Sequence, residues 1–489
     1  MTSSPPSREL NQLEWLSVSY LCLPILVFLL GWLRWPYALI LGLLTLIGWA
    51  TVSHRRTLNW PSLNRWGWLG ITIVACAWVA LSGLVSPFFL NADWLVRMSV
   101  LRDLTVGDWP VGYGTLDADH QNLLLRLPMG YYLVPALLGK VLGGTEAAGR
   151  WMLALWTVLG AFLFLAMTVA NSQGEGRWRG LWIPLLLAVG FSGMDVIGGL
   201  VHRHGWPPTG AHIEWWAELF QYSSNTTQLF WVPNHSLPGW IAGLLIWRHR
   251  EQGLSLGASA LLMLGVVTWA PLVAIGLAPL LFVCSLRGQT WMGWVREWGR
   301  LDVLALLLPG FFMARFITFG VPSEAAGTLA EAGPLGPVVA RLVMFSLLEW
   351  ALLAWVVFRA GERSWVFWLA AAELLLLPLL RFGPGNDIVM RGGIPALTIM
   401  MCAAMTLLSQ HAPKHRSFQW ATWFILAAGA VTPYQEISRV LVEGDRFESQ
   451  GQNFIQINGT PWHYIGELQG TWLSHVLESP KITLPELNK

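Results

Sequence analysis

Two charged residues in the segment NADWLVR, Asp93 and Arg97, are spaced so that they could act together. Residues four apart share one face of a helix, so the two side chains can form an ion pair. A carboxylate can take a proton from a hydroxyl group, and a guanidinium offers a fork of donors that matches phosphate oxygens. Both follow an apolar segment directly, and ionisable groups at membrane depth usually mark functional sites. The alternative is a solvated ion pair on an amphipathic helix at a membrane surface.

A second polar group begins at Asp195, in the stretch FSGMD, and continues through residues 201–235. Small residues beside Asp195 would let another group approach its backbone. Glu214 and His235 follow among tryptophans. This mixture suits a sugar or lipid-phosphate pocket, because rings cover the apolar faces of a pyranose while carboxylates and amides bind its hydroxyls. An aromatic belt with ordinary loop histidines would have the same composition. The other titratable residues that we note in this segment are His202, His204, His212 and Glu218.

The histidines do not have the spacing of a zinc site. His202 and His204 are two residues apart and cannot share a helix face, and no HExxH-like pattern occurs. The four cysteines lie far apart within apolar runs, which indicates small buried hydrophobic residues. We therefore predict no metal-ligating set of residues, while a divalent cation stays open as a cofactor.

A third group lies in RFGPGNDIVMRGGIP, residues 381–395, between two apolar segments. Asn386, Asp387 and Arg391 sit beside glycines and a proline, which predicts a tight turn and not the interior of a helix. Arg391 is a candidate for binding an anion such as a phosphate. The alternative is a purely structural pair between Asp387 and Arg391.

The composition of the chain tells which elements must position these residues. Of its 489 residues 54% are hydrophobic and only 12% are charged, against about 25% charged residues in ordinary soluble domains. This balance predicts an integral membrane protein. The formal net charge of +2 gives no electrostatic footprint for nucleic acid, so we expect none as a partner.

A helix needs about 20 apolar residues to cross the hydrocarbon core. That criterion predicts an all-α, polytopic bundle of about thirteen spans. We place them at residues 15–34, 36–53, 67–89, 149–170, 180–200, 236–248, 254–269, 271–286, 301–319, 338–358, 364–381, 393–409 and 417–433.

Arginine and lysine in short loops predict the orientation, because such residues stay on the cytoplasmic side. With the N-terminus inside, every predicted inner loop is basic and the C-terminus is outside. Residues 126–144 decide this assignment. They contain two prolines and Lys140 around a short apolar core, so we predict an interfacial helix that lies along the membrane without crossing it. The basic residues of the inner loops are Arg55, Arg56, Arg65, Arg177, Arg179, Arg248, Arg250, Arg287, Arg296, Arg300, Arg359, Arg363, Lys414 and Arg416.

In this topology all three polar groups face the exterior. The membrane domain comprises residues 1–433, with long outer loops at 90–148 and 201–235. Residues 434–489 form a short extracytoplasmic tail that we expect to pack on the outer face of the bundle. We expect a multi-pass protein of a bacterial inner (plasma) membrane, with its active site toward the periplasm or exterior.

This order of elements resembles the GT-C superfamily, the polytopic glycosyltransferases that use polyprenyl-phosphate sugars. LNADWLVRMSVLRDLTVGDWPV is similar to the opening of that family's long outer loop, which begins with an acidic residue and carries two interfacial helices. RLPMGYYLVPALLGKVLGGTEAAGRW is similar to the second interfacial helix and the next span, and Asp195 takes the position of a later acidic residue. The resemblance covers roughly residues 67–290. The chain departs from the family plan by two additional N-terminal spans and by a single acid at Asp93.

The resemblance implies a transfer of sugar to a lipid, glycan or protein acceptor with inversion at the anomeric carbon. Asp93 would be the base that activates the acceptor hydroxyl, and Arg97 or Arg391 would stabilise the leaving polyprenyl phosphate. Asp195, Glu214 and His235 would bind donor or acceptor sugar. Two alternatives belong to other classes of protein: a transporter or flippase of lipid-linked saccharides, and a non-catalytic GT-C-like scaffold in envelope polysaccharide assembly.

Overall fold

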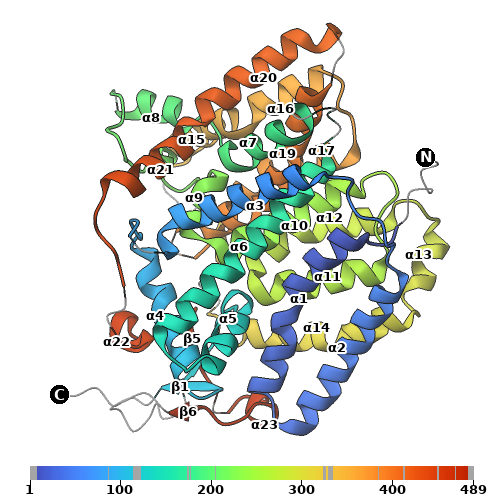
Figure 1. Ribbon diagram of the computed structural model, residues 1–489, viewed down its shortest axis with the longest axis vertical. Helices are drawn as coiled ribbons and strands as arrows, with labels where there is room; N and C mark the ends of the chain where they lie inside the picture. Colours follow the sequence, from blue (N-terminus) through green and yellow to red (C-terminus); the bar gives the residue numbers. More distant parts are fainter. Residues whose placement is uncertain are drawn as a thin grey trace.

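The computed structural model describes residues 8–482, except for residues 86, 114–122, 173, 175, 177, 204, 323–325, 329–333, 384, 411–412, 449–450 and 469. Within these residues the chain is mainly helical (Figure 1). Seven helices are long and apolar enough to cross a membrane, and there is an eighth if one bent pair forms a single span. These helices indicate an integral membrane protein of the helical class.

Helices occupy all thirteen segments that we predicted as spans. The seven that have the length of a span are α1 (Gln12–Trp32), α2 (Trp35–Arg55), α3 with η1 (Arg65–Leu84), α6 (Glu146–Asn171), η3 with α7 and α8 (Trp178–His202), α14 (Leu301–Thr318), and α15 with η7 and α16 (Leu335–Arg359). The other six are α10 (Pro233–Arg248), α11 (Leu256–Trp269), α12 (Pro271–Leu286), α17 (Trp365–Leu376), α19 (Ile394–Ser409) and α20 (Arg416–Gly429). These six have between 12 and 16 residues. Length and composition therefore identify seven candidate spans, and the other six stay predictions.

The short helix α10 is central in the bundle. It contacts α6, α11, α12 and α19, and its residues 233–247 are all buried. Gly239 and Gly243 lie one turn apart on the face toward α19. A Cβ atom at Gly239 would lie 2.5 Å from Cγ2 of Ile394, and one at Gly243 would lie 2.7 Å from Cβ of Thr398. The two glycines therefore allow the close approach of α10 and α19 that small residues four apart give in membrane helices.

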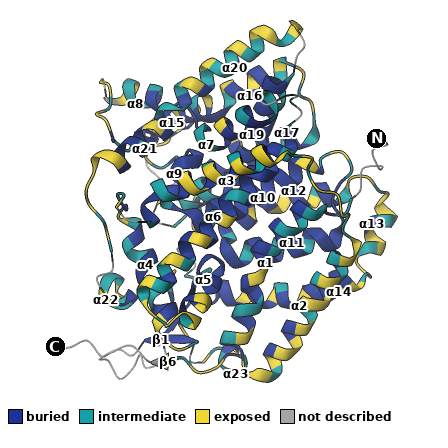
Figure 2. Cartoon of the chain, viewed as in Figure 1, coloured by how far each residue is buried: buried dark blue, intermediate teal, exposed yellow. Residues whose placement is uncertain are grey.

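The outer surface of the bundle is apolar over several helices. Figure 2 shows exposed residues along α2, α3 and α20. They include large side chains such as Leu39 and Leu43 on α2 and Trp420 and Phe424 on α20. A soluble protein rarely exposes apolar surface so widely, whereas lipid solvates it. This surface is what a helical membrane protein needs.

The segment predicted to lie along the membrane, 126–144, contains the helix α5 (Gly130–Val141). Its 12 residues rise about 18 Å, well short of a hydrocarbon core of about 30 Å. The N-terminal half of α5 is buried against α6, α1 and α4 (Asp93–Val106). Helix length therefore does not make α5 a candidate span, just as it does not for the six short helices above. α5 packs into the protein instead of lying free on a membrane surface.

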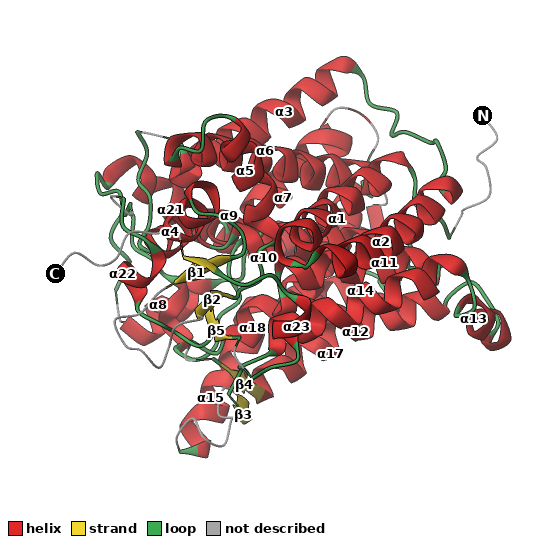
Figure 3. Ribbon diagram, turned by 90° about the horizontal axis from the view of Figure 1, so that it is seen from below, coloured by secondary structure: helices red, strands yellow, loops and turns green. Residues whose placement is uncertain are grey.

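Two small sheets accompany the helices of the predicted all-α bundle. β1 (Val111–Tyr113), β2 (Leu123–Leu125), β5 (Ile465–Glu467) and β6 (Lys481–Ile482) form a four-stranded sheet in the order β5-β2-β1-β6, in which only β1 and β6 are parallel (Figure 3). β3 (Ala326–Thr328) pairs with β4 (Leu380–Phe382). Strands of two or three residues carry no periodic signal, and their partners lie far away in the sequence, so the sequence pattern could not predict them.

The C-terminal tail packs on one end of the bundle, beside the segment 90–148. The predicted tail, residues 434–489, begins inside α21 (Val431–Val442) and also contains α22 (Phe454–Asn458) and α23 (Leu473–Val476). Arg34, between α1 and α2, donates to the carbonyl of Leu477 at 3.0 Å, and Arg150 of α6 pairs with Glu448 at 2.8 Å. β5 and β6 then tie the tail to the strands of the 90–148 segment.

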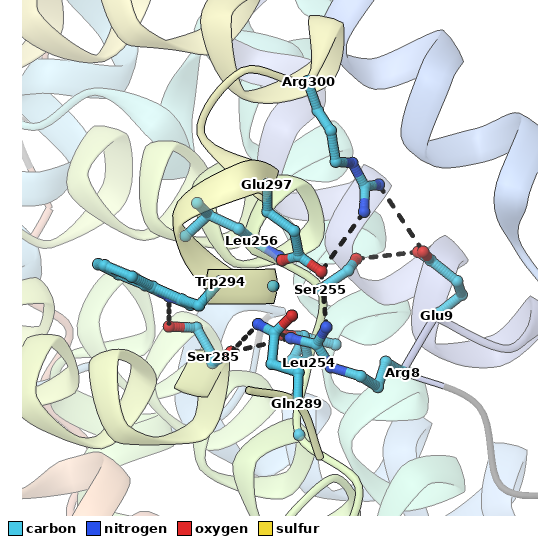
Figure 4. Close-up of polar contacts among 12 residues, drawn as sticks. Arg8, Glu9, Leu254, Ser255, Leu256, Ser285, Gln289, Trp294, Glu297 and Arg300 are labelled. Atoms are coloured by element: carbon cyan, nitrogen blue, oxygen red, sulfur yellow. Dashed lines mark hydrogen bonds and ion pairs between the residues drawn. The ribbon is translucent and has the colours of Figure 1, made fainter. Parts of the chain in front are cut away.

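The residues before α1 contact α13 (Trp291–Glu297) and the start of α11, and Figure 4 shows Arg8 beside Glu297 and Leu254. Arg8 donates to Glu297 at 2.6 Å and to the carbonyls of Leu254 and Ser285 at 3.0 and 2.8 Å. Glu297 also accepts the backbone N–H of Leu256, the first residue of α11, at 2.8 Å. One carboxylate therefore joins the start of the described chain to α11 and α13.

Candidate functional site

The ion pair predicted from the sequence is present in the first turn of α4. Arg97 Nη2 lies 3.1 Å from Asp93 Oδ2. The Arg97 side chain is only 7% exposed, whereas that of Asp93 is 46% exposed. Arg97 also donates through Nε to the carbonyl of Trp231 at 2.9 Å. A buried guanidinium therefore fixes a carboxylate that a molecule from outside can reach.

The carbonyl that Arg97 holds belongs to a break between two helices. α9 (Asn225–Trp231) ends, Val232 leaves helical geometry at φ −137° and ψ 50°, and α10 begins at Pro233. Asn91 Nδ2 and Trp94 Nε1 both donate to the carbonyl of Phe230 at 2.8 Å. Carbonyls at a helix end lack partners within the helix. Side chains at and just before the start of α4 donate the hydrogen bonds that these carbonyls need.

The first turn of α10 places Asn234 and His235 beside this break. Both are buried, each with 6% exposure, and the nitrogens Asn234 Nδ2 and His235 Nε2 lie 3.2 Å apart. Asn234 Oδ1 and His235 Nδ1 have no hydrogen-bond partner among the described residues. Buried polar atoms are nearly always satisfied, so these two mark a place where a bound molecule would supply the missing partners.

Arg391 approaches the same place from α18 (Asp387–Gly392). The guanidinium groups of Arg391 and Arg97 both interact electrostatically with the ring of His235. Arg391 Nη2 lies 2.8 Å from Asp387 Oδ1, while Arg391 Nε has no partner in the described part of the chain. We call Asp93, Arg97, Asn234, His235, Asp387 and Arg391 the central polar cluster.

Residues 381–395 form the predicted tight turn at Asn386 and then a short helix, α18. Asn386 adopts the left-handed conformation (φ 53°) that turns favour, and its side chain accepts from Phe382 N at 3.3 Å and donates to the carbonyl of Leu219 at 3.2 Å. Asp387 and Arg391, however, lie in the helix α18 and not in the turn. The flanking glycines and proline obscured this short helix in the sequence.

Asp195 belongs to a second, enclosed group of polar residues. It starts α8 (Asp195–Arg203), and only 2% of the residue is exposed. Its carboxylate accepts from Thr432 at 2.8 Å and from Ser192 and the indole N–H of Trp216 at 3.2 Å. The same indole lies 3.3 Å from Glu349 Oε1. Asp195 therefore has its partners within the protein.

Glu214 lies in the same interior region, in the short helix η4 (Glu214–Ala217). It accepts from the backbone N–H of Ser224 at 2.9 Å and from Gln221 at 2.8 Å. Burial raises its pKa to about 7, with Asp195 and Glu436 raising it and His212 lowering it. At neutral pH this carboxyl group is thus near the midpoint of its titration.

The remaining predicted residues of the 201–235 segment do not form one site. His212 pairs with Glu436 at 2.7 Å, His202 is exposed, and Glu218 pairs with Arg341 at the surface. His204 lies outside the described residues. The described residues contain no group of three or more His, Cys, Asp or Glu that could hold a metal ion. A divalent cation stays a prediction without a ligand set there.

Two buried acids of this second group were missed in the sequence. Glu349 is an ionisable residue within the apolar run LLEWALL, which is by itself a signal of function or of a buried partner. Glu436 accepts from the indole N–H of Trp231 at 2.9 Å and pairs with Arg439 at 3.0 Å. Trp231 thus touches both groups, since its carbonyl accepts from Arg97.

The raised pKa of Glu214 makes a prediction about stability. The protonated carboxyl stabilises the folded protein fully below its ordinary pKa of 4.5, and this contribution is lost as the pH rises through about 7. We expect Glu214→Gln to flatten the fall in unfolding temperature across this window, measured in detergent by tryptophan fluorescence. Glu218→Gln, at the surface of the same segment, should leave the slope unchanged. Identical slopes for Glu214→Gln and the wild type would contradict the assignment.

No protein-family model matches the chain, and the chain has no match among curated proteins or solved structures. The fold and its apolar surface define the class as a helical integral membrane protein. The residues of the central polar cluster are therefore the main indication of what this protein does.

Proposed function

We propose that the protein is a membrane glycosyltransferase that moves a sugar from a polyprenyl-phosphate donor to a lipid, glycan or protein acceptor. The observation that carries this proposal is the central polar cluster. An accessible carboxylate, two guanidinium groups and an imidazole come together beside the start of a helix, and buried polar atoms there have no partner among the described residues. This combination suits a substrate that carries both a phosphate and hydroxyl groups.

Asp93 is the base in the proposed reaction. Its Oδ2 is held by Arg97, and the side chain is half exposed, so an acceptor hydroxyl can reach the carboxylate. A sugar hydroxyl is a weak nucleophile, and a carboxylate within hydrogen-bond reach lowers the barrier by taking its proton. The hydroxyl oxygen then attacks the anomeric carbon as the bond to phosphate breaks, which inverts the configuration in a single displacement.

The leaving polyprenyl phosphate is an anion, and the cluster offers several groups that favour it. Arg391 has a free Nε donor among the described residues, and a guanidinium binds phosphate oxygens through parallel donors. The N-terminus of α10 contributes the positive end of a helix dipole. Arg391 is the principal phosphate ligand in this proposal, with His235 and Asn234 as further polar contacts.

We further propose that the cluster faces the exterior of a bacterial inner membrane, with the N-terminus of the chain inside and thirteen spans. Two observations support this orientation. The segments assigned to the outside, 90–148 and the tail, pack together at one end of the bundle. Arg8, Arg55 and Arg300, assigned to the inside, gather at the other ends of α1 and α2, around Glu297 and Asp302.

A transporter or flippase of lipid-linked saccharides is the second candidate. The break between α9 and α10 favours it, because discontinuous helices with polar residues at the break are common in transporters. The two candidates differ in whether a covalent bond of the substrate is broken.

The purified protein in proteoliposomes, supplied with a radiolabelled polyprenyl-phosphate sugar and a membrane extract as the source of acceptor, tests this proposal. We expect label to move from the donor to a lipid, glycan or protein fraction. Movement of intact donor between leaflets, without transfer of label, would instead favour the transporter. The absence of both would contradict the glycosyltransferase and the transporter alike.

A further inference from the structure

The C-terminal tail brings a short aromatic segment, Trp462, His463 and Tyr464, to the central polar cluster. We call these three residues the tail turn. The backbone on either side of His463 is held by Arg126, whose guanidinium donates to the carbonyl of Trp462 and whose backbone N–H donates to the carbonyl of Tyr464 at 2.7 Å. The strand β5 follows immediately and pairs with β2. The tail turn is thus fixed from its backbone.

Ring contacts fix the side chains on both sides of His463. Trp462 meets Phe382, which precedes α18, edge to face with centroids 6.4 Å apart. Tyr464 packs on Phe454 with centroids 5.0 Å apart, and the backbone N–H of Phe454 donates to Asp103 of α4 at 2.8 Å. The tail turn is therefore bound to the elements that carry Arg391 and Asp93, although more than 350 residues separate it from α4.

The charges of the cluster act directly on the tail turn. His463 interacts electrostatically with Asp387, Arg391 and Arg126. His463 itself is exposed, and its ring makes no hydrogen bond within the described part of the chain. It is a polar group held in place and open to a ligand.

The surroundings of His463 favour a hydroxyl as its partner over a phosphate. Its partial burial lowers its pKa, as do Arg391 and Arg126, while Asp387 opposes them. A neutral imidazole offers one donor and one acceptor, which matches a hydroxyl group. The phosphate of a polyprenyl-phosphate sugar would be drawn to the guanidinium groups instead, and the sugar attached to it would then lie next to the ring.

We propose that the tail turn forms one wall of the substrate site and that His463 hydrogen-bonds a hydroxyl of the donor sugar. This inference rests on the proposed function, because it takes the donor to be a polyprenyl-phosphate sugar. It assigns a specificity-determining role to a segment that lies beyond the last predicted span. Trp462 and Tyr464 set the position of the exposed ring, and the carbohydrate hydroxyl bonds to it in place of water.

Kinetics and direct binding of the donor to the full-length protein in nanodiscs test this inference. We expect His463→Ala to raise both KM and Kd for the polyprenyl-phosphate sugar about 3- to 10-fold, as the loss of one hydrogen bond predicts, with little change in kcat. His463→Gln should be affected less, since an amide keeps a donor and an acceptor. His475→Ala, at an exposed histidine of α23 in the same tail, should behave like the wild type.

A simple loss of folding is excluded if the unfolding temperature of His463→Ala equals that of the wild type. A binding constant for plain polyprenyl phosphate, without sugar, should not change in the variant. If His463→Ala binds the sugar donor as tightly as the wild type, the inference is overturned. If the wild type binds the donor without transferring it and His463→Ala binds it more weakly, the inference stands while the proposed transferase function fails. A wild type that does not bind the donor overturns both.

Discussion

Asp93→Asn should reduce sugar transfer about 10²- to 10⁴-fold, the usual contribution of a positioned general base, without unfolding the protein. The change removes the proton acceptor and keeps the shape of the side chain. Asn can still accept a hydrogen bond from Arg97, which at present lies 3.1 Å from the carboxylate, and Arg97 keeps its bond to the carbonyl of Trp231. The measurement is the initial rate of label transfer from a polyprenyl-phosphate sugar at saturating donor.

The matched control for this variant is Asp445→Asn. Asp445 is an exposed acid of the tail at the same end of the bundle, where it holds Leu90 only through its backbone carbonyl. It should transfer sugar at the wild-type rate. A wild-type rate for Asp93→Asn, with both variants folded, would remove Asp93 as the base and leave the pair with Arg97 as a structural feature.

Arg391→Gln should lower kcat about 10²- to 10³-fold, the effect of removing one group that stabilises developing charge. The charge of Arg391 acts on the ring of His235, and Arg391 Nε has no partner within the described residues. Gln retains hydrogen-bond donors but not the charge. Arg391→Lys keeps the charge but loses the fork that matches phosphate oxygens, so we expect an intermediate rate.

A surface arginine provides the comparison for Arg391. Arg341→Gln removes a cation from the ion pair with Glu218, and surface pairs contribute little to stability. Its rate should equal that of the wild type. If Arg391→Gln lowered the unfolding temperature but left kcat unchanged, the Asp387 to Arg391 pair would be structural, which is the alternative that the sequence left open.

The parts of the site that could be predicted are those that depend on neighbours in the sequence. Asp93 and Arg97 are four residues apart, as are Asp387 and Arg391, and both ion pairs form because each pair lies on one turn of a helix. The thirteen apolar segments are helical for the same local reason. The number of spans cannot be predicted from apolar segments alone. A central helix such as α10 is apolar because other helices bury it, and it need not be as long as a span.

The small residues beside Asp195 let another group approach the backbone, as predicted, but that group belongs to the protein and is not a substrate. We expected them to let another group approach the backbone, and one does. A Cβ atom at Gly193 would lie 1.9 Å from Oε2 of Glu349, so the glycine makes room for a side chain of the protein's own helix η7 (Leu347–Ala351). The sequence could not identify this partner, because it lies more than 150 residues away. A role of Asp195 and Glu214 in substrate binding stays a prediction.

The tail turn could not be anticipated for a related reason. Residues 462–464 form no periodic pattern, and their position depends on Arg126, on the pairing of β5 with β2 and on Phe382. Each of these contacts joins segments that are distant in the sequence. The sequence therefore predicted that the tail packs on the bundle, but not that residues 462–464 lie beside Phe382 and Arg126.

In the proposed reaction this chain breaks the bond between a sugar and a polyprenyl phosphate at the cluster of Asp93, Arg97, His235 and Arg391. The most direct measurement is the chemical fate of a doubly labelled donor that is placed only in the outer leaflet of sealed vesicles, with the tail exposed on that side. We predict that the wild type releases polyprenyl phosphate and yields a glycosylated acceptor of inverted anomeric configuration. Recovery of the donor intact, with acceptor present and the protein folded, would contradict the claim.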